Sequence, residues 1–301
     1  MKLADLPSRR VEAWKYSDLR GSLSEHALPA EKPRPAQAWG KLDGVIERLA
    51  LAQNAHAITK VRAGATELLV ERLADAPLAA SVREIQVAPG ASLTRVVLQP
   101  AAAGVVLNAA HVFVADGGVF RQIVLAEGAK LGRVETHVTV EGEGAQVELN
   151  GIYMSGRGHH ADLTSTIEHQ VPNGQTRQLI KGVARDGGRG VFQGKIIVAH
   201  GAQQTDARQY HHGLLLEDGA EIFAKPELLI HADDVQCAHG NTAGGLDENA
   251  LFYLRSRGVP ERQARALLIE AFLADAIPAD LPSEIDGELR DRIRAWLGSA
   301  A

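Results

Sequence analysis

Cysteine and aromatic residues are scarce in this 301-residue chain. Cys237 is its one cysteine, and aromatic side chains make up only 4% of the residues. A single cysteine excludes an internal disulfide framework, so the composition gives no indication of secretion. A core poor in aromatic rings is built from valine, leucine, isoleucine and alanine, which suits flat, regularly stacked layers.

Excess positive charge and long apolar runs are also lacking. The formal net charge is −5 and the pI is about 6.2, which argues against general binding to nucleic acids or anionic membranes, because both require a positive field. No apolar stretch is long enough to cross a bilayer, and residues 1–10 lack the apolar run of a signal peptide. We therefore expect a soluble cytoplasmic protein with no nucleic-acid or membrane partner.

The common motifs of enzymes are absent as well. The pair Gly194-Lys195 is followed by Ile196, where a P-loop requires a hydroxyl residue. No Cys-x-x-Cys, His-Glu-x-x-His or Gly-x-Ser-x-Gly sequence occurs, and one cysteine cannot supply a zinc site built from several thiolates. These absences predict that the protein is not an enzyme.

Glycine, by contrast, is plentiful, and its placement indicates the fold. Between residues 76 and 246, short β-branched runs alternate with Gly-Ala corners at Gly90-Ala91, Gly128-Ala129, Gly144-Ala145, Gly201-Ala202 and Gly219-Ala220. Glycine permits a positive φ at the bend, and alanine is small enough to lie under the next layer. No helical period interrupts this region, which disfavours a βαβ sheet. An antiparallel sandwich stays open, but the scarcity of hairpin signals favours a mainly β fold of stacked strands, a parallel β-helix.

Helical patterns flank this region on both sides. Residues 1–75 form a mixed N-terminal region, and residues 247–301 form a helical C-terminal region. Asp247 is expected to cap a helix over 248–257, with Gly258 as its terminating residue. One apolar face is expected for the next helix, made of Ala264, Leu267, Leu268, Ala271 and Phe272.

Cys237 and His239 are the candidate metal ligands. Residues two apart on a strand project from the same face, within reach of one ion, and thiolate and imidazole are ligands that iron and zinc accept. A lone cysteine is, however, more often a small buried hydrophobe, and a neighbouring histidine is more often a hydrogen-bonded structural residue. The spacing alone leaves both interpretations open.

Other polar groups favour structural roles. The pair Asp233-Asp234 supplies either carboxylate ligands or, more commonly, the cap of a turn. The histidines of His159-His160 and of His211-His212 are adjacent, so on a strand they project from opposite faces and form no natural chelate. The helix over 248–257 presents apolar and basic side chains that belong either to a solvated helix or to a surface for a partner.

Several stretches of the chain resemble the SufB/SufD family of iron–sulfur cluster assembly scaffold proteins. The resemblance is specific along 233–240 and 251–258, and it extends to Gln204–Gln209, Lys225–Leu228 and the N-terminal Glu12–Tyr16. It implies a right-handed parallel β-helix flanked by N-terminal and C-terminal α-helical regions. That fold agrees with the solenoid favoured by the glycine corners.

Within this family the chain looks like the SufD branch. That branch carries a Cys-x-His in the Asp-Asp-Val stretch, here Cys237 and His239, with Ala238 in place of the usual serine. The SufB branch instead has a cysteine in the helix motif, where this chain has Leu254. The resemblance implies a non-catalytic scaffold subunit that pairs with SufB and binds the ATPase SufC.

The resemblance also implies where the partners bind. SufC would dock on the C-terminal helical region, for which the candidates are Leu251, Phe252, Tyr253, Arg255 and Arg257. His239 would face SufB and, with Cys237, take part in cluster assembly. No tightly bound cofactor is expected, only a transient iron–sulfur cluster at the interface with SufB. Whether the isolated chain forms a homodimer stays open, and the alternative function is a β-helix enzyme that acts on polysaccharides through carboxylates along a groove.

Overall fold

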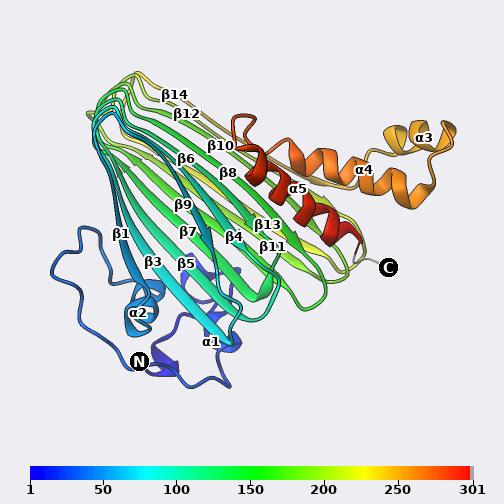
Figure 1. Ribbon diagram of the computed structural model, residues 1–301, viewed down its shortest axis with the longest axis horizontal. Coiled ribbons are helices and arrows are strands. Elements are labelled where there is room, and N and C mark those ends of the chain that lie inside the picture. Colours follow the sequence, from blue (N-terminus) through cyan, green and yellow to red (C-terminus); the bar gives the residue numbers. More distant parts are fainter. Residues whose placement is uncertain (299–301) are drawn as a thin grey trace.

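The computed structural model describes residues 1–298 and shows a solenoid built from two parallel sheets (Figure 1). The first sheet has the order β1 (His56–Val61), β3 (Leu78–Val87), β5 (Ala102–Val114), β7 (Ala129–Val140), β9 (His160–His169), β11 (Arg189–Val198) and β13 (Glu221–Ile230). The second has the order β14 (Gln236–Gly244), β12 (Asp206–Leu215), β10 (Gln175–Ala184), β8 (Gln146–Ser155), β6 (Val119–Ala126), β4 (Ser92–Gln99) and β2 (Thr66–Arg72). Successive strands alternate between the sheets, and the pairings are parallel, so the chain coils as a β-helix of about 7 turns.

The solenoid begins earlier in the chain than the expected boundary at residue 76. Strand β1 starts at His56, and β2 completes the first coil. The turn between them contains Gly64, whose φ is 70°, followed by Ala65. This is another Gly-Ala corner, so the sequence already carried the signal for the first turn.

Most of the expected corners have the predicted conformation. Gly90, Gly128, Gly144 and Gly219 have positive φ, and the alanines after the first three are fully buried. Gly201 does not have positive φ, and that expectation was wrong. In its longer turn the left-handed residue is Gln204, with a φ of 59°, and its N–H donates to the carbonyl of Asp234 in the next coil.

The N-terminal region covers the outer face of the first sheet. It holds η1 (Leu3–Asp5), η2 (Glu12–Trp14), α1 (Leu19–Ser22) and α2 (Val45–Ala52). Its buried apolar side chains, among them Leu19 and Ile46, pack with Val105 and Leu107 of β5 in one hydrophobic cluster. The N-terminal region, rather than another sheet, therefore buries the outer face of these first-sheet strands.

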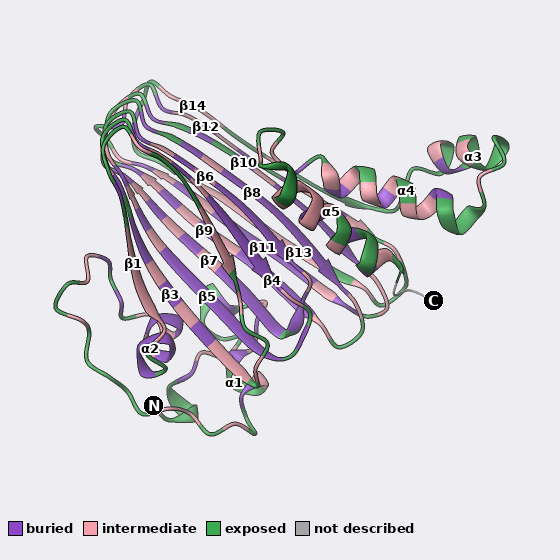
Figure 2. Ribbon diagram, viewed as in Figure 1, coloured by how far each residue is buried: buried purple, intermediate pink, exposed green. Residues whose placement is uncertain are grey.

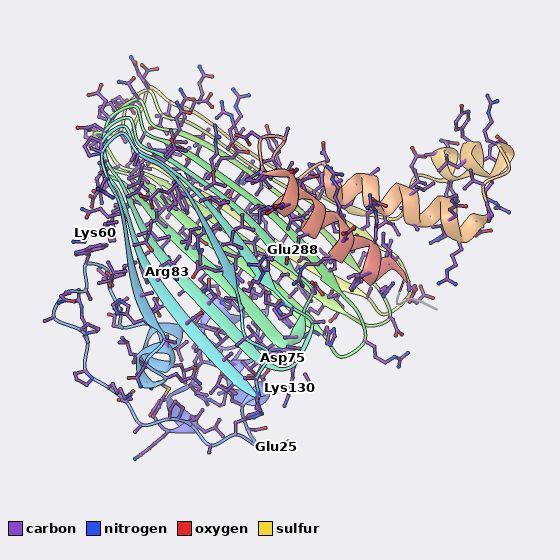
Figure 3. The ribbon with its side chains drawn as sticks, in the orientation of Figure 1. Glu25, Lys60, Asp75, Arg83, Lys130 and Glu288 are labelled. Carbon is purple, nitrogen blue, oxygen red and sulfur yellow. The ribbon has the colours of Figure 1, made fainter. Side chains whose placement is uncertain are left out.

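The C-terminal helices cover part of the second sheet and then extend beyond it. They are α3 (Glu248–Ser256), α4 (Glu261–Ala274) and α5 (Ser283–Gly298). Ile293 and Trp296 of α5 share a hydrophobic cluster with Ile123 of β6. Glu288, labelled in Figure 3, lies over this sheet and pairs with Arg72 of β2 at 2.6 Å.

Helices α3 and α4 form an arm that projects from the solenoid (Figure 1). Asp247 caps α3, and Gly258 follows it with a φ of 86°, so both predicted end signals are confirmed. The expected apolar face of α4 is confirmed only in part: Ala264 is buried and Phe272 packs against the sheet cluster, but Leu267 is 45% exposed. The buried positions also include Ile269 and Leu273, which the pattern did not predict. Only the later part of α4 packs with the sheet cluster, so the earlier turns keep apolar side chains in solvent. Within residues 1–298, the structure contains no helix with the length and hydropathy needed to span a membrane.

Candidate functional site at the open end of the solenoid

Strands β13 and β14 end the two sheets, and each pairs with a neighbour on one side only. The N–H of Gln236 donates to the carbonyl of Thr205, the residue just before β12. Because N–H and C=O of one residue point to the same side of a parallel strand, the even-numbered residues of β14 bond to β12. The main-chain groups of Cys237 and His239 therefore lie on the open edge. Figure 2 shows how exposed this strand is compared with the inner coils.

The side chains of Cys237 and His239 project toward the solenoid interior. On β12, Ala207 and Gln209 are fully buried between the sheets, and they pair in register with Cys237 and His239. Partners in register on parallel strands share a face. The structure thus brings the thiol and the imidazole together on one face, as the two-residue spacing predicts.

Cys237 is half-buried and packs against the interior hydrophobic cluster. Burial raises the pKa of its thiol, and a main-chain hydrogen bond from Ala207 only partly opposes this effect. A raised pKa keeps the thiol protonated near neutral pH, and it is the thiolate that binds metals. In the isolated chain, Cys237 therefore has the properties of a small hydrophobe more than those of a ligand.

His239 is exposed, because β14 is the outermost strand of its sheet and no further coil of the described chain covers it. Directly beneath it, Gln209 donates from Nε2 to the carbonyl of Glu227 at 3.2 Å. Among residues 1–298, no group of three or more His, Cys, Asp or Glu side chains is arranged to hold a metal ion. Cys237 and His239 are therefore not part of such a group among the described residues.

His211 anchors β14 to the coil below, a role that the sequence did not reveal. Its Nδ1 lies 2.6 Å from Asn241 Oδ1, and its Nε2 lies 2.9 Å from the Tyr153 hydroxyl. Its ring also stacks on Phe192, with centroids 5.3 Å apart. Burial is the main reason that the pKa of His211 is lowered to about 4. A neutral imidazole fits this arrangement, since Nδ1–H can donate to the amide oxygen while Nε2 accepts from the hydroxyl.

The other polar pairs make contacts within the solenoid. The Asp234 N–H donates to Gln203 Oε1 at 2.9 Å, which fixes the turn before β14. In each adjacent histidine pair one member is buried, His160 in one and His211 in the other. The neighbour of His211, His212, contacts Thr242. The difference in burial within each pair agrees with adjacent side chains that project from opposite faces of a strand.

One cluster has the residue types of a hydrolase triad but not its geometry. Ser17 Oγ lies 3.0 Å from His160 Nε2 and donates to Asp162 at 2.5 Å. In a triad the carboxylate bonds to the imidazole and orients it, whereas here it bonds to the serine and to Arg133. Ser17 and Asp162 are fully buried. The cluster fastens the N-terminal region to the first sheet.

The arm exposes most of the residues proposed to bind an ATPase. Phe252 is 74% exposed and Tyr253 is 57% exposed, while Leu251 is buried at 3%. Arg255 pairs with Glu261 at 3.4 Å, and Arg257 lies over the Tyr253 ring at 5.3 Å from its centroid. The surface of the arm is therefore an apolar pair beside two arginines, with Leu251 covered by the arm itself.

A cavity lined by the C-terminal helices lies away from Cys237 and His239. Its volume is about 920 Å³, and it lies between α4, α5 and the ends of β10 and β12. Arginines and glutamates alternate around it, among them Arg262, Arg265, Glu217 and Glu270. Neither Cys237 nor His239 lines this cavity, so it is not part of the candidate site.

Comparison with protein-family models identifies the family of the chain. The model of the SUF system FeS cluster assembly, SufBD core domain, matches residues 45–272. The chain belongs to the SufBD family. The match includes β1 to β14 together with α2, α3 and most of α4.

The relatives of this SufBD protein support the SufD-like resemblance. The iron-sulfur cluster assembly protein SufD of Escherichia coli (strain K12) is 38% identical over 164 residues, which cover 54% of this chain and 38% of that protein. The SufBD family protein slr0076 of Synechocystis is 37% identical over 171 residues, covering 57% of this chain and 38% of the relative. Protein ABCI7, chloroplastic, of Arabidopsis thaliana is 37% identical over 179 residues, covering 59% and 38%. The chain therefore matches well under half the length of these relatives.

Proposed function

We propose that this SufD-like chain is a non-catalytic scaffold subunit of an iron–sulfur cluster assembly complex, with a SufB-like subunit docked on β13 and β14. The observation that carries the proposal is the position of His239. It is exposed on the last coil, beside an unpaired strand edge that a second protein could extend. The cluster would be cargo passing through the interface, and no tightly bound cofactor is proposed.

The chemistry of the edge supports a shared site. His239 offers one accessible imidazole, and burial raises the pKa of the Cys237 thiol, two residues earlier on the same strand. A nearby cation or metal from the partner would favour the thiolate and expel its proton. The partner would thus complete a ligand set that the described residues of this chain do not form alone.

The decisive experiment is His239→Ala in a complex reconstituted with SufB-like and SufC-like subunits under anaerobic conditions. Cluster yield, measured by absorbance and iron and sulfide content, should fall while the complex still assembles. The matched control is His231→Ala, because His231 is also exposed and lies in the loop that leads to β14. An unchanged cluster yield for His239→Ala would show that His239 has no role in cluster formation.

The arm is proposed as the SufC-like ATPase site, because Phe252 and Tyr253 are large exposed side chains without a packing role in the solenoid. Such residues are typical of binding surfaces.

We also propose a cytoplasmic location, which the half-buried free thiol suits. The alternative, an enzyme acting on polysaccharides, would require activity on a polyuronate, and no observation favours it.

A further inference from the structure

Two motifs that are far apart in the sequence meet on the outer face of the first sheet. Glu12 of the N-terminal motif accepts a hydrogen bond from Lys225 Nζ at 2.5 Å. The Tyr16 ring stacks on Phe223, with centroids 5.1 Å apart and an interplanar angle of 22°. Phe223 and Lys225 both belong to β13, so the N-terminal motif contacts the last strand of the sheet.

Each ring of the stacked pair also has a cation near it. Lys15 Nζ lies 5.7 Å from the Tyr16 centroid, and the Arg189 guanidinium lies 5.6 Å from the Phe223 centroid. Arg189 of β11 also pairs with Glu221, the first residue of β13. Aromatic stacking and cation–π contacts thus join three segments at the start of β13.

The N-terminal motif is itself firmly attached to the inner coils. Trp14 is buried, and the Arg133 guanidinium of β7 lies 4.1 Å from its ring centroid. Arg133 pairs with Asp162 of β9 at 2.7 Å, and Asp162 also accepts from Ser17. The motif therefore spans from β7 and β9 to β13 and can transmit their rigidity to the edge.

Strand β13 needs such support more than an inner strand does. It pairs only with β11, and Pro226 stands at its centre. The N–H of Glu221 donates to the carbonyl of Gly188, just before β11, and the N–H of His231 donates to that of Val198 at its end. Odd-numbered residues of β13 therefore direct their main-chain groups toward β11, and Pro226 directs its own toward the open edge. A missing N–H costs no ladder bond there, but it leaves the open edge without a donor at Pro226.

We propose that the N-terminal motif Glu12–Tyr16 is a brace that holds β13 in the conformation on which the partner subunit docks. The docking step rests on the proposed function, whereas the support of β13 does not. Tyr16 is then a positioning residue for an interface that it does not touch. The Glu12–Lys225 pair adds little energy, because Glu12 is largely exposed, and it serves chiefly to align the strand.

Hydrogen exchange on the full-length protein tests the brace directly. Tyr16→Ala should speed exchange of the Phe223, Lys225 and Glu227 amides by roughly two- to tenfold, the factor expected from losing one aromatic pair. Amides of β5 should not change. Tyr16→Phe keeps the stacked ring and should behave as wild type. Unchanged β13 exchange in Tyr16→Ala would overturn the proposal.

Binding to the SufB-like subunit of the same organism tests the second step. Tyr16→Ala should weaken binding by a factor similar to its effect on exchange. Each single substitution Glu12→Lys and Lys225→Glu should weaken it slightly, and the double charge swap should restore it. Faster exchange with unchanged affinity would overturn the link to docking. If the wild-type chain does not bind at all, the proposed partner is wrong. The hydrogen-exchange rates then still test whether Glu12–Tyr16 supports β13.

Discussion

At the scale of single residues, the structure separates Cys237 from His239. Both project from the same face of β14, but the thiol packs into the core while the imidazole is exposed. The two-residue spacing predicted the shared face, because strand alternation is a local property. It could not predict the difference in burial, which depends on contacts with other coils: Cys237 lies in register with Ala207 and packs against the interior cluster, whereas His239 lies in register with Gln209.

The raised pKa of Cys237 leads to a prediction about its reactivity. Because burial disfavours the thiolate, alkylation by iodoacetamide at pH 7.5 should be at least several-fold slower than that of a free cysteine, and it should rise with pH beyond the usual range. Mass spectrometry of the intact protein measures the rate. The control is Ala238→Cys in a Cys237→Ala background, which places a thiol on the opposite, outward face of β14 and should react faster. Equal rates at the two positions would contradict the assigned burial.

At the scale of elements, the arm shows why pattern and packing disagree. The sequence pattern of α4 favours a face through Leu267 and Ala271, yet the structure buries Ile269 and Leu273. Helix period alone fixes which residues share a face. Which face is buried depends on tertiary contacts, because Ile269 and Leu273 pack in one cluster with residues of α5 and of the second sheet.

The exposed pair on α3 leads to a prediction about ATPase binding. The double substitution Phe252→Ala with Tyr253→Ala should weaken binding of the SufC-like subunit by about tenfold or more, since large exposed aromatics often dominate interfaces. Calorimetry on the full-length protein measures the affinity. Leu68→Ala is the matched control, because Leu68 is 45% exposed on β2, in the first coil of the solenoid. A loss of affinity in the control but not in the α3 variant would place the ATPase site elsewhere.

At the scale of the whole molecule, stability rests on a solenoid that buries several histidines. His160, His169 and His211 lie on β9 and β12, and desolvation is the largest cause that lowers the pKa of each to about 4. Their ordinary pKa is about 6.5. The unfolded chain therefore binds more protons than the folded chain between these two values.

This difference predicts how stability depends on pH. Each of these histidines contributes stability that is fully present above about pH 6.5 and is lost as the pH falls toward 4, by at most about 3 kcal/mol per group. The raised pKa of His137 opposes the trend. Urea unfolding at pH 7, 5.5 and 4.5 measures the decline. The variant His169→Gln should show a smaller decline in the free energy of unfolding between pH 7 and pH 4.5, whatever its free energy of unfolding at pH 7. His231→Gln, at an exposed site, should leave the decline unchanged. An unaltered slope in His169→Gln would mean that His169 is not buried as a neutral group.

The sequence by itself determined the β-helix, most of its glycine corners, the cap of α3 and the shared face of Cys237 and His239. These follow from local rules of backbone conformation and strand alternation, which act within a few residues. Only the tertiary structure decided that β13 and β14 form an open edge, that His211 anchors Asn241, and that Glu12 meets Lys225. Such contacts join residues that are tens to hundreds of positions apart, so they depend on how many coils stack and where the stack ends.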